Sequence, residues 1–257
     1  MGDLPPAGNV SKSASRVLAQ PLLFLPPGGQ QLHFFGSLDR LYRYIFYAVC
    51  HPGHLARPAL WHNPFPLCYR ETGIFIGFLV GLTLLAELHP HRPSELPQRR
   101  VLAFIGLAFA LLAADGVASY AGIGSTNETR LATGLLVGFG LSALILPSLN
   151  AALFRRPSLE RLLQERRPLA LWLLAPPVAF AAIWYHPLGV GYVMPHLAAA
   201  AVVLLIATVN LFGLSKVRLY AAAEESVMEV MPWLLASVGL ALAELALLAA
   251  GHSLIHG

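Results

Sequence analysis

The chain has 257 residues, of which 56% are hydrophobic and 12% are charged, and its formal net charge is +4 at pH 7. Soluble domains use about twice that share of charged residues. The apolar residues also fall in blocks of about 20, the length of helix that crosses a bilayer core. Composition therefore excludes an ordinary soluble domain. The sequence has no basic stripe with interleaved aromatic residues, so we expect no nucleic-acid partner.

The amino-terminal part of the chain is too polar to cross a membrane. Residues 1–32 contain PP, PPGG and a serine-rich stretch, which predict an irregular arm. Residues 33–50 interleave aromatic and arginine side chains, a pattern typical of an amphipathic helix lying in the membrane interface. A loop with Pro, His and Trp completes this second unit, residues 33–71. Residues 17–26 are too short and proline-broken for a cleaved signal peptide.

Six apolar blocks then predict an all-α, polytopic membrane helix bundle over residues 72–257. The expected spans are 72–88, 101–123, 131–149, 169–185, 196–214 and 233–250. Pro176-Pro177 lies within the fourth span, where it is expected to kink the helix or open its hydrogen-bond ladder.

Basic residues predict the orientation of the bundle. The loops after the first, third and fifth spans carry three, five and two Lys or Arg, whereas the loops after the second and fourth spans and the tail carry one, none and none. The positive-inside rule places the basic loops in the cytoplasm and both termini outside. The six basic residues of the amino-terminal segment oppose this assignment, although long segments weigh less in the rule. We expect a multi-pass protein of a cell's inner, plasma membrane.

One region stands apart from generic membrane sequence. Cys50-His51 is followed by Pro66-Leu67-Cys68-Tyr69-Arg70-Glu71-Thr72-Gly73, then by Asp115-Gly116 and by Ser125-Thr126-Asn127 to Arg130-Leu131-Ala132-Thr133-Gly134. These spaced motifs resemble the bacterial and archaeal membrane-protein family catalogued as domain of unknown function 2085, over about residues 42–140. The resemblance implies a membrane location and a shared polar cluster, with no assigned reaction.

The resemblance has one departure, which concerns a metal site. The family reads Cys-x-Arg-Cys-Thr-Gly where this chain has Glu71 in place of the last cysteine. The family's three cysteines and a histidine would suit tetrahedral zinc. Cys50, His51, Cys68 and Glu71 could still form a harder, weaker site, so zinc is the candidate cofactor. Two alternatives stay open: Cys50 and Cys68 form a disulfide, or both are free thiols.

Two carboxylates and a pair of glycines within the spans complete the set of candidates. Asp115 is interpreted either as an ion or ligand site or as the partner of Arg130 in a structural pair. Glu244 has no basic partner nearby in sequence. Gly134 and Gly138 have the small-xxx-small spacing that lets helices approach closely.

No catalytic triad, phosphate-binding loop, dinucleotide fingerprint or HExxH motif occurs, so no catalytic residue is proposed and an enzyme is not favoured. Three functions remain, in descending order. The first is a non-catalytic subunit of a larger membrane complex, contacting lipid and other membrane subunits. The second is a small enzyme or metal-binding protein that uses the cysteine cluster. The third is a transporter that uses Asp115 and Glu244.

Overall fold

The computed structural model describes residues 38–50, 59–60, 63–64, 67–154, 157–185, 190–216 and 227–256. The predicted irregular arm, residues 1–32, lies outside these ranges, and so does His51.

The prediction of six membrane-spanning helices is confirmed: six described helices are long and apolar enough to cross a bilayer. Each observed helix begins before the apolar block that predicted it, because polar residues can continue a helix, but the second span ends at Tyr120, three residues before the expected end at Ile123. Thr126, for example, is the N-cap of the third span and forms a capping box. Its hydroxyl accepts from the Thr129 backbone amide, and the Thr129 hydroxyl accepts from the Thr126 backbone amide. The spanning helices are α3 (Tyr69–Leu88), α4 (Arg99–Tyr120), α5 (Asn127–Leu153), α6 (Arg166–Tyr185), α7 (Val190–Lys216) and α8 (Val227–His256).

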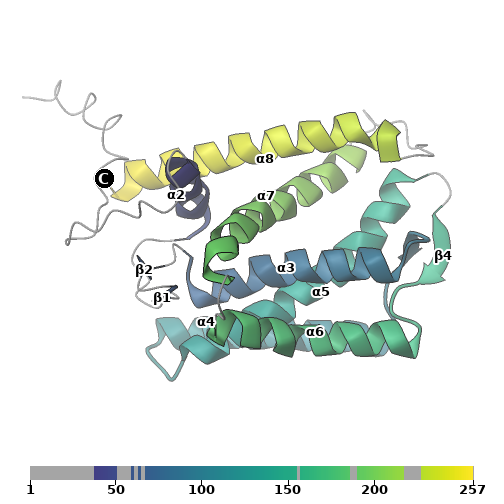
Figure 1. Ribbon diagram of the computed structural model, residues 1–257, viewed down its shortest axis with the longest axis horizontal. Coiled ribbons are helices and arrows are strands. Elements are labelled where there is room, and N and C mark those ends of the chain that lie inside the picture. The colour runs from purple at the N-terminus through teal and green to yellow at the C-terminus, as the bar shows by residue number, and fades with distance from the viewer. Residues whose placement is uncertain are drawn as a thin grey trace, which may run out of the picture.

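The spans alternate in direction, so the bundle has two ends (Figure 1). We call the end where α3 begins and α4 finishes the cluster end, and the opposite end, where α4 and α6 begin, the arginine end. Figure 1 shows α7 and α8 on one side of the molecule, α4 and α6 on the other, and α3 and α5 between them. Two of the three motif-bearing spans, α3 and α5, therefore form the centre of the bundle.

The core is built on the α3–α5 contact. Phe78, Leu131 and Leu135 are fully or almost fully buried there, and Phe139 extends the contact to Trp172 of α6, with ring centroids 6.4 Å apart. The outer helices α4, α6 and α8 instead carry many exposed leucine and valine side chains. An exposed apolar belt of this kind suits a surface solvated by lipid.

An amphipathic helix precedes the spans, as the pattern of residues 33–50 predicts. It is α2 (Leu38–Val49), and it packs on α7 and α8 at the cluster end. Phe46 is its main buried side chain, at 1% exposed. The hydroxyl of Tyr42 is hydrogen-bonded to the His196 ring of α7, and the two rings meet edge to face. The side chains of α2 therefore connect the second unit of the chain to the bundle.

Two short strand pairs were not predicted. β1 (Ala59–Leu60) pairs with β2 (Asn63–Pro64) antiparallel, and β3 (Pro93–Glu95) pairs with β4 (Ser158–Arg161) in parallel. The second pair joins the loops that follow α3 and α5 at the arginine end, where the Asn150 amide donates to the Pro93 carbonyl at 2.9 Å. Segments of two to four residues carry no readable alternation. Such strands form only once the helices have placed their loops side by side.

The two prolines of the fourth span do not end its helix. α6 continues as one helix from Arg166 to Tyr185 through Pro176 and Pro177. Prolines are tolerated in membrane helices where neighbours satisfy the freed carbonyls.

A candidate metal centre and its polar neighbours

Three potential metal ligands meet at the cluster end. One donor atom each from Cys50, Cys68 and Glu71 lies within 4.8 Å of the others. Cys50 directly follows α2, Cys68 is the N-cap of α3, and Glu71 is in the first turn of α3. The junction between the amphipathic helix and the first span thus brings together residues far apart in sequence.

Backbone geometry holds the two cysteines in place. The Cys50 amide donates to the Phe46 carbonyl at 2.9 Å, which continues the last turn of α2. Cys68 is extended, with φ −72° and ψ 163°, and its side chain makes no capping bond. Its carbonyl instead accepts from the Thr72 amide and hydroxyl, both at 2.9 Å. The Cys68 thiol is therefore left for other contacts.

The cluster is buried and one of its oxygens is unsatisfied. Cys50 and Cys68 are 2% and 6% exposed, and no disulfide joins the two. Glu71 is partly buried, and its Oε2 atom is buried without a hydrogen-bond partner. Buried carboxylate oxygens normally have a partner, so an orphaned one requires an explanation. A bound cation would supply it.

The two thiols titrate as a pair. The hydrogen bond between them lowers the pKa of Cys68 to about 6 and raises the pKa of Cys50 above its usual range. The first thiolate is stabilised by the neighbouring thiol, while a second would stand beside an existing negative charge. Cys68 is accordingly the thiolate formed first, and thiolate is the form that binds metal.

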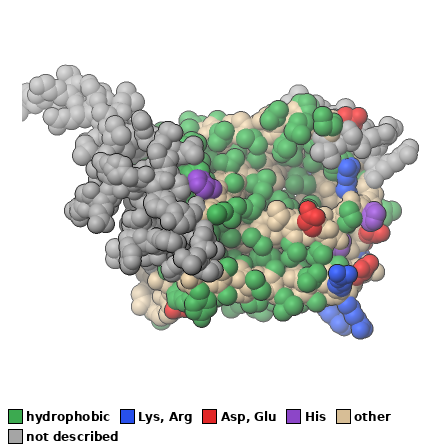
Figure 2. Space-filling model, viewed as in Figure 1, with side chains coloured by type: hydrophobic (Ala, Val, Ile, Leu, Met, Phe, Trp, Pro, Cys, Tyr) green, Lys and Arg blue, Asp and Glu red, His purple; other side chains and the backbone are tan. Residues whose placement is uncertain are grey.

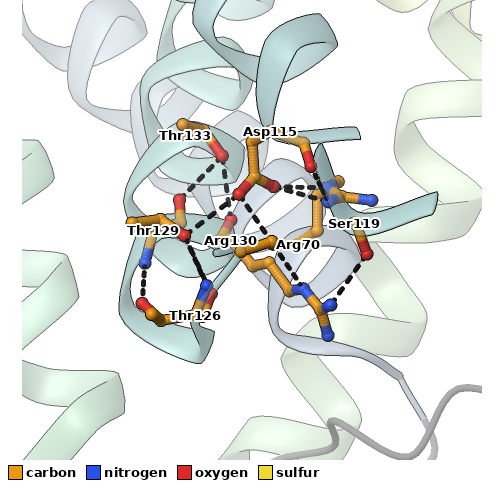
Figure 3. A network of polar contacts seen from close by, with 8 residues as sticks. Arg70, Asp115, Ser119, Thr126, Thr129, Arg130 and Thr133 are labelled. Carbon is orange, nitrogen blue, oxygen red and sulfur yellow. Dashed lines mark hydrogen bonds and ion pairs between the residues drawn. The ribbon is translucent and has the colours of Figure 1, made fainter. Parts of the chain in front are cut away.

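A second polar group lies beside this cluster, on α3, α4 and α5 (Figure 3). The Arg70 guanidinium forms an ion pair with Asp115, donating from Nε to Oδ2 at 3.1 Å and from Nη2 to both Oδ2 and the backbone carbonyl. The other oxygen, Oδ1, accepts from Ser125 at 2.9 Å and from Thr129 at 3.0 Å. Protein donors therefore occupy both oxygens of the Asp115 carboxylate.

The predicted pairing of Asp115 with Arg130 needs correction. Arg130 donates to the Ser125 hydroxyl at 3.0 Å and to the Ser119 hydroxyl at 2.7 Å, so it joins the network one bond away from the carboxylate. Arg70 reaches Asp115 because α5 packs against both α3 and α4, and the start of α3 and the end of α4 lie at the same end of the bundle. Arg70 stands in the cysteine motif, which was the available signal, but nothing in sequence links it to Asp115.

Gly134 and Gly138 lie where α5 meets α3. A Cβ at Gly134 would overlap the Arg70 carbonyl, and one at Gly138 would overlap the Ile74 carbonyl. Gly73 lies on the facing side, where a Cβ would stand 2.7 Å from the Leu131 carbonyl. Backbone therefore packs on backbone beside the polar network, as small-residue packing in membranes requires.

Glu244 is remote from both polar groups. It is partly buried on α8, and its Oε2 accepts from the Asn210 amide of α7 at 3.1 Å. This contact supplies the partner that sequence did not reveal. The two carboxylates of the transporter hypothesis, Asp115 and Glu244, thus belong to separate contacts.

The comparisons with known proteins agree with the motifs. Residues 50–144 match the family described as Predicted membrane protein (DUF2085), which confirms the resemblance. No curated protein and no solved structure matches the chain. The matched stretch runs from Cys50 through α3 and α4 into α5, and it includes both polar groups. The chain is an integral membrane protein in which residues 50–144 match the model of the DUF2085 family.

Proposed function

We propose that this protein binds a thiophilic metal ion, zinc by preference, through Cys50, Cys68 and Glu71. The observation that carries the proposal is the convergence of three donor atoms within 4.8 Å in a buried place, where one oxygen of Glu71 has no hydrogen-bond partner. Convergence of this kind costs desolvation and charge repulsion. A cation offsets both.

The donor set suits zinc. Zinc takes four ligands, with bonds of about 2.3 Å to sulfur and about 2.0–2.2 Å to oxygen, which places tetrahedral donors roughly 3.5–3.8 Å apart. The three donors already lie within 4.8 Å of one another, so small side-chain adjustments suffice. His51, predicted as a ligand and adjacent in sequence to Cys50, is the proposed fourth donor. Glu71, in place of a cysteine, makes the set harder than three thiolates.

The position of the ligands favours a structural role of the ion over a catalytic one. The ligands come from the end of α2 and the start of α3, so a bound ion would fasten the amphipathic helix to the bundle. Zinc would supply charge neutralisation and cross-linking there, as it does in structural sites. This fits the absence of a catalytic motif in the sequence.

Metal analysis of the full-length protein, purified in mild detergent without chelator, tests the proposal. We expect about one zinc per chain, loss of the metal in Cys68→Ser, and substantially reduced content in Glu71→Gln. The matched control is Glu128→Gln, since Glu128 is an exposed carboxylate at the same end. Zinc-free wild type that also fails to take up added zinc contradicts the proposal.

The same sample separates the two alternatives left open by sequence. Alkylation under denaturing conditions, after chelation, should modify both cysteines without reductant. If modification requires reductant, Cys50 and Cys68 form a disulfide and the metal hypothesis fails. If both are modified but no metal is ever bound, they are free thiols.

The accessory-subunit hypothesis stays a prediction and is compatible with a structural metal site. It is supported by the composition of the arm, residues 1–32, since disordered segments can order on a partner. Mild extraction and native gel sizing test it. A large assembly that is weakened by deleting residues 1–30 supports a subunit, and a chain that migrates alone contradicts it.

The finer address of the protein is likewise a proposal. We infer a bacterial plasma membrane with the arginine end in the cytoplasm and the cluster end outside, because the basic loops all lie at the arginine end. In this orientation the metal centre faces the non-cytoplasmic side.

A further inference from the structure

Four arginines gather where α4 and α6 begin. Arg99 and Arg100 open α4, and Arg166 and Arg167 open α6. All four side chains are exposed, and none of them forms an ion pair with another residue in the part of the chain that the structure describes. Figure 2 shows basic side chains projecting at the end of the molecule where α6 begins.

The two helix starts lie side by side. Gln98 lies one residue before α4, and Gln164 lies two residues before α6. The side-chain amide of Gln98 donates to the backbone carbonyl of Gln164 at 3.5 Å. One to two turns further along, the rings of Phe104 and Trp172 meet edge to face at 6.1 Å. The arginine pairs of the two helices therefore lie at neighbouring helix starts.

The electrostatics of this arrangement are unfavourable without an anion. Cations are disfavoured at the positive, amino-terminal end of a helix dipole, and neither helix has an acidic residue in its first turn. Of the nearby acids, Glu95 pairs with Arg161 on the strand pair, and Glu165, directly before α6, is a single exposed carboxylate beside the four arginines. The two helix starts together therefore keep a net positive charge.

We propose that the surface between the starts of α4 and α6 binds an anionic phospholipid, with its phosphate between the two arginine pairs. The apolar surface below the arginines favours a lipid over free phosphate. Leu107 on α4 is 56% exposed and Leu174 on α6 is 61% exposed, so exposed apolar surface that suits acyl chains follows the arginines on both helices. Guanidinium groups hold phosphate oxygens in bidentate fashion. This site is independent of the metal proposal.

Binding of phosphatidylglycerol, measured by native mass spectrometry on the full-length protein, tests the site. An arginine near an anionic surface contributes on the order of a fivefold gain in binding, so Arg99→Gln with Arg166→Gln should weaken binding by roughly 25-fold. The matched control, Arg161→Gln with Lys216→Gln, removes equal charge from the same end and should bind as wild type does. Phosphatidylcholine should bind weakly to all three proteins.

Three results would overturn the proposal. Equal weakening in both double variants would show diffuse attraction rather than a site. Wild type that binds phosphatidylglycerol no better than phosphatidylcholine would remove the site altogether. Displacement of the lipid by millimolar inorganic phosphate would show that the four arginines bind a free anion and not a lipid. If the double variant fails to fold, Arg99→Gln and Arg166→Gln are measured singly, with about fivefold weakening expected for each.

Discussion

Asp115 shows how one side chain can be accommodated within a membrane span. A carboxylate in this position costs free energy unless protein or water faces it. Here Arg70 neutralises it, and Ser125 and Thr129 donate to its second oxygen. The pair links α3 to α4, and Thr129 adds α5. The network is therefore a junction of three helices, and its saturated hydrogen bonding favours a structural role over ion transport.

We expect Asp115→Asn to lower the free energy of unfolding by about 3 kcal/mol, because it leaves the Arg70 charge largely buried without its partner. The side chains of Arg70 and Asp115 are only 17% and 7% exposed. Denaturant unfolding in detergent measures the change. As a control, Arg161→Gln breaks an ion pair whose members are 47% and 46% exposed, and it should cost under about 1 kcal/mol. Equal losses in both variants would contradict the structural role of the network.

At the scale of elements, the α3–α5 contact organises the molecule. Glycines on both helices let the two backbones touch. This contact fixes the position of Arg70 along the bundle axis, where it meets Asp115. α3 also carries two ligands of the candidate metal centre, Cys68 at its cap and Glu71 in its first turn. Displacing α3 would therefore disturb both polar groups together.

Gly134→Ala should destabilise the protein by roughly 1–3 kcal/mol, because the added methyl group overlaps the Arg70 carbonyl and backbone cannot move aside cheaply. Thermal unfolding in detergent provides the measurement. Gly106→Ala is the matched control, since a Cβ there meets nothing within 4 Å. It should be neutral or slightly stabilising, as alanine is the better helix former. A neutral Gly134→Ala would show that the helices can separate without cost.

The whole molecule is polarised along the bundle. The cluster end holds the thiols, Glu71 and the Asp115 network, whereas the arginine end holds the strand pair and the four arginines. A membrane is polarised in a matching way, since its cytoplasmic leaflet is the anionic one. The proposed orientation would connect the two proposed sites, with the metal centre outside and the four arginines at the cytoplasmic leaflet.

Reporter fusions at the carboxyl terminus test this orientation. Alkaline phosphatase fused after Gly257 should be active, because it folds outside the cytoplasm, and green fluorescent protein at the same place should be dark. Fusions within the loop between α5 and α6 should give the reverse pattern. A fluorescent carboxyl terminus would invert the bundle and place the four arginines outside, which contradicts the positive-inside assignment.

The sequence by itself determined the number of spans, the amphipathic helix and the family resemblance. A block of about 20 apolar residues has one solution in lipid, a helix that satisfies its own backbone, so local sequence suffices for these features. It also marked Cys50, Cys68 and Glu71 as candidate ligands. Only the tertiary structure decided the partner of Asp115, the β3–β4 pair and the proximity of the starts of α4 and α6. These depend on which helices are neighbours and how each is rotated, and contacts between distant segments leave no local pattern in the chain.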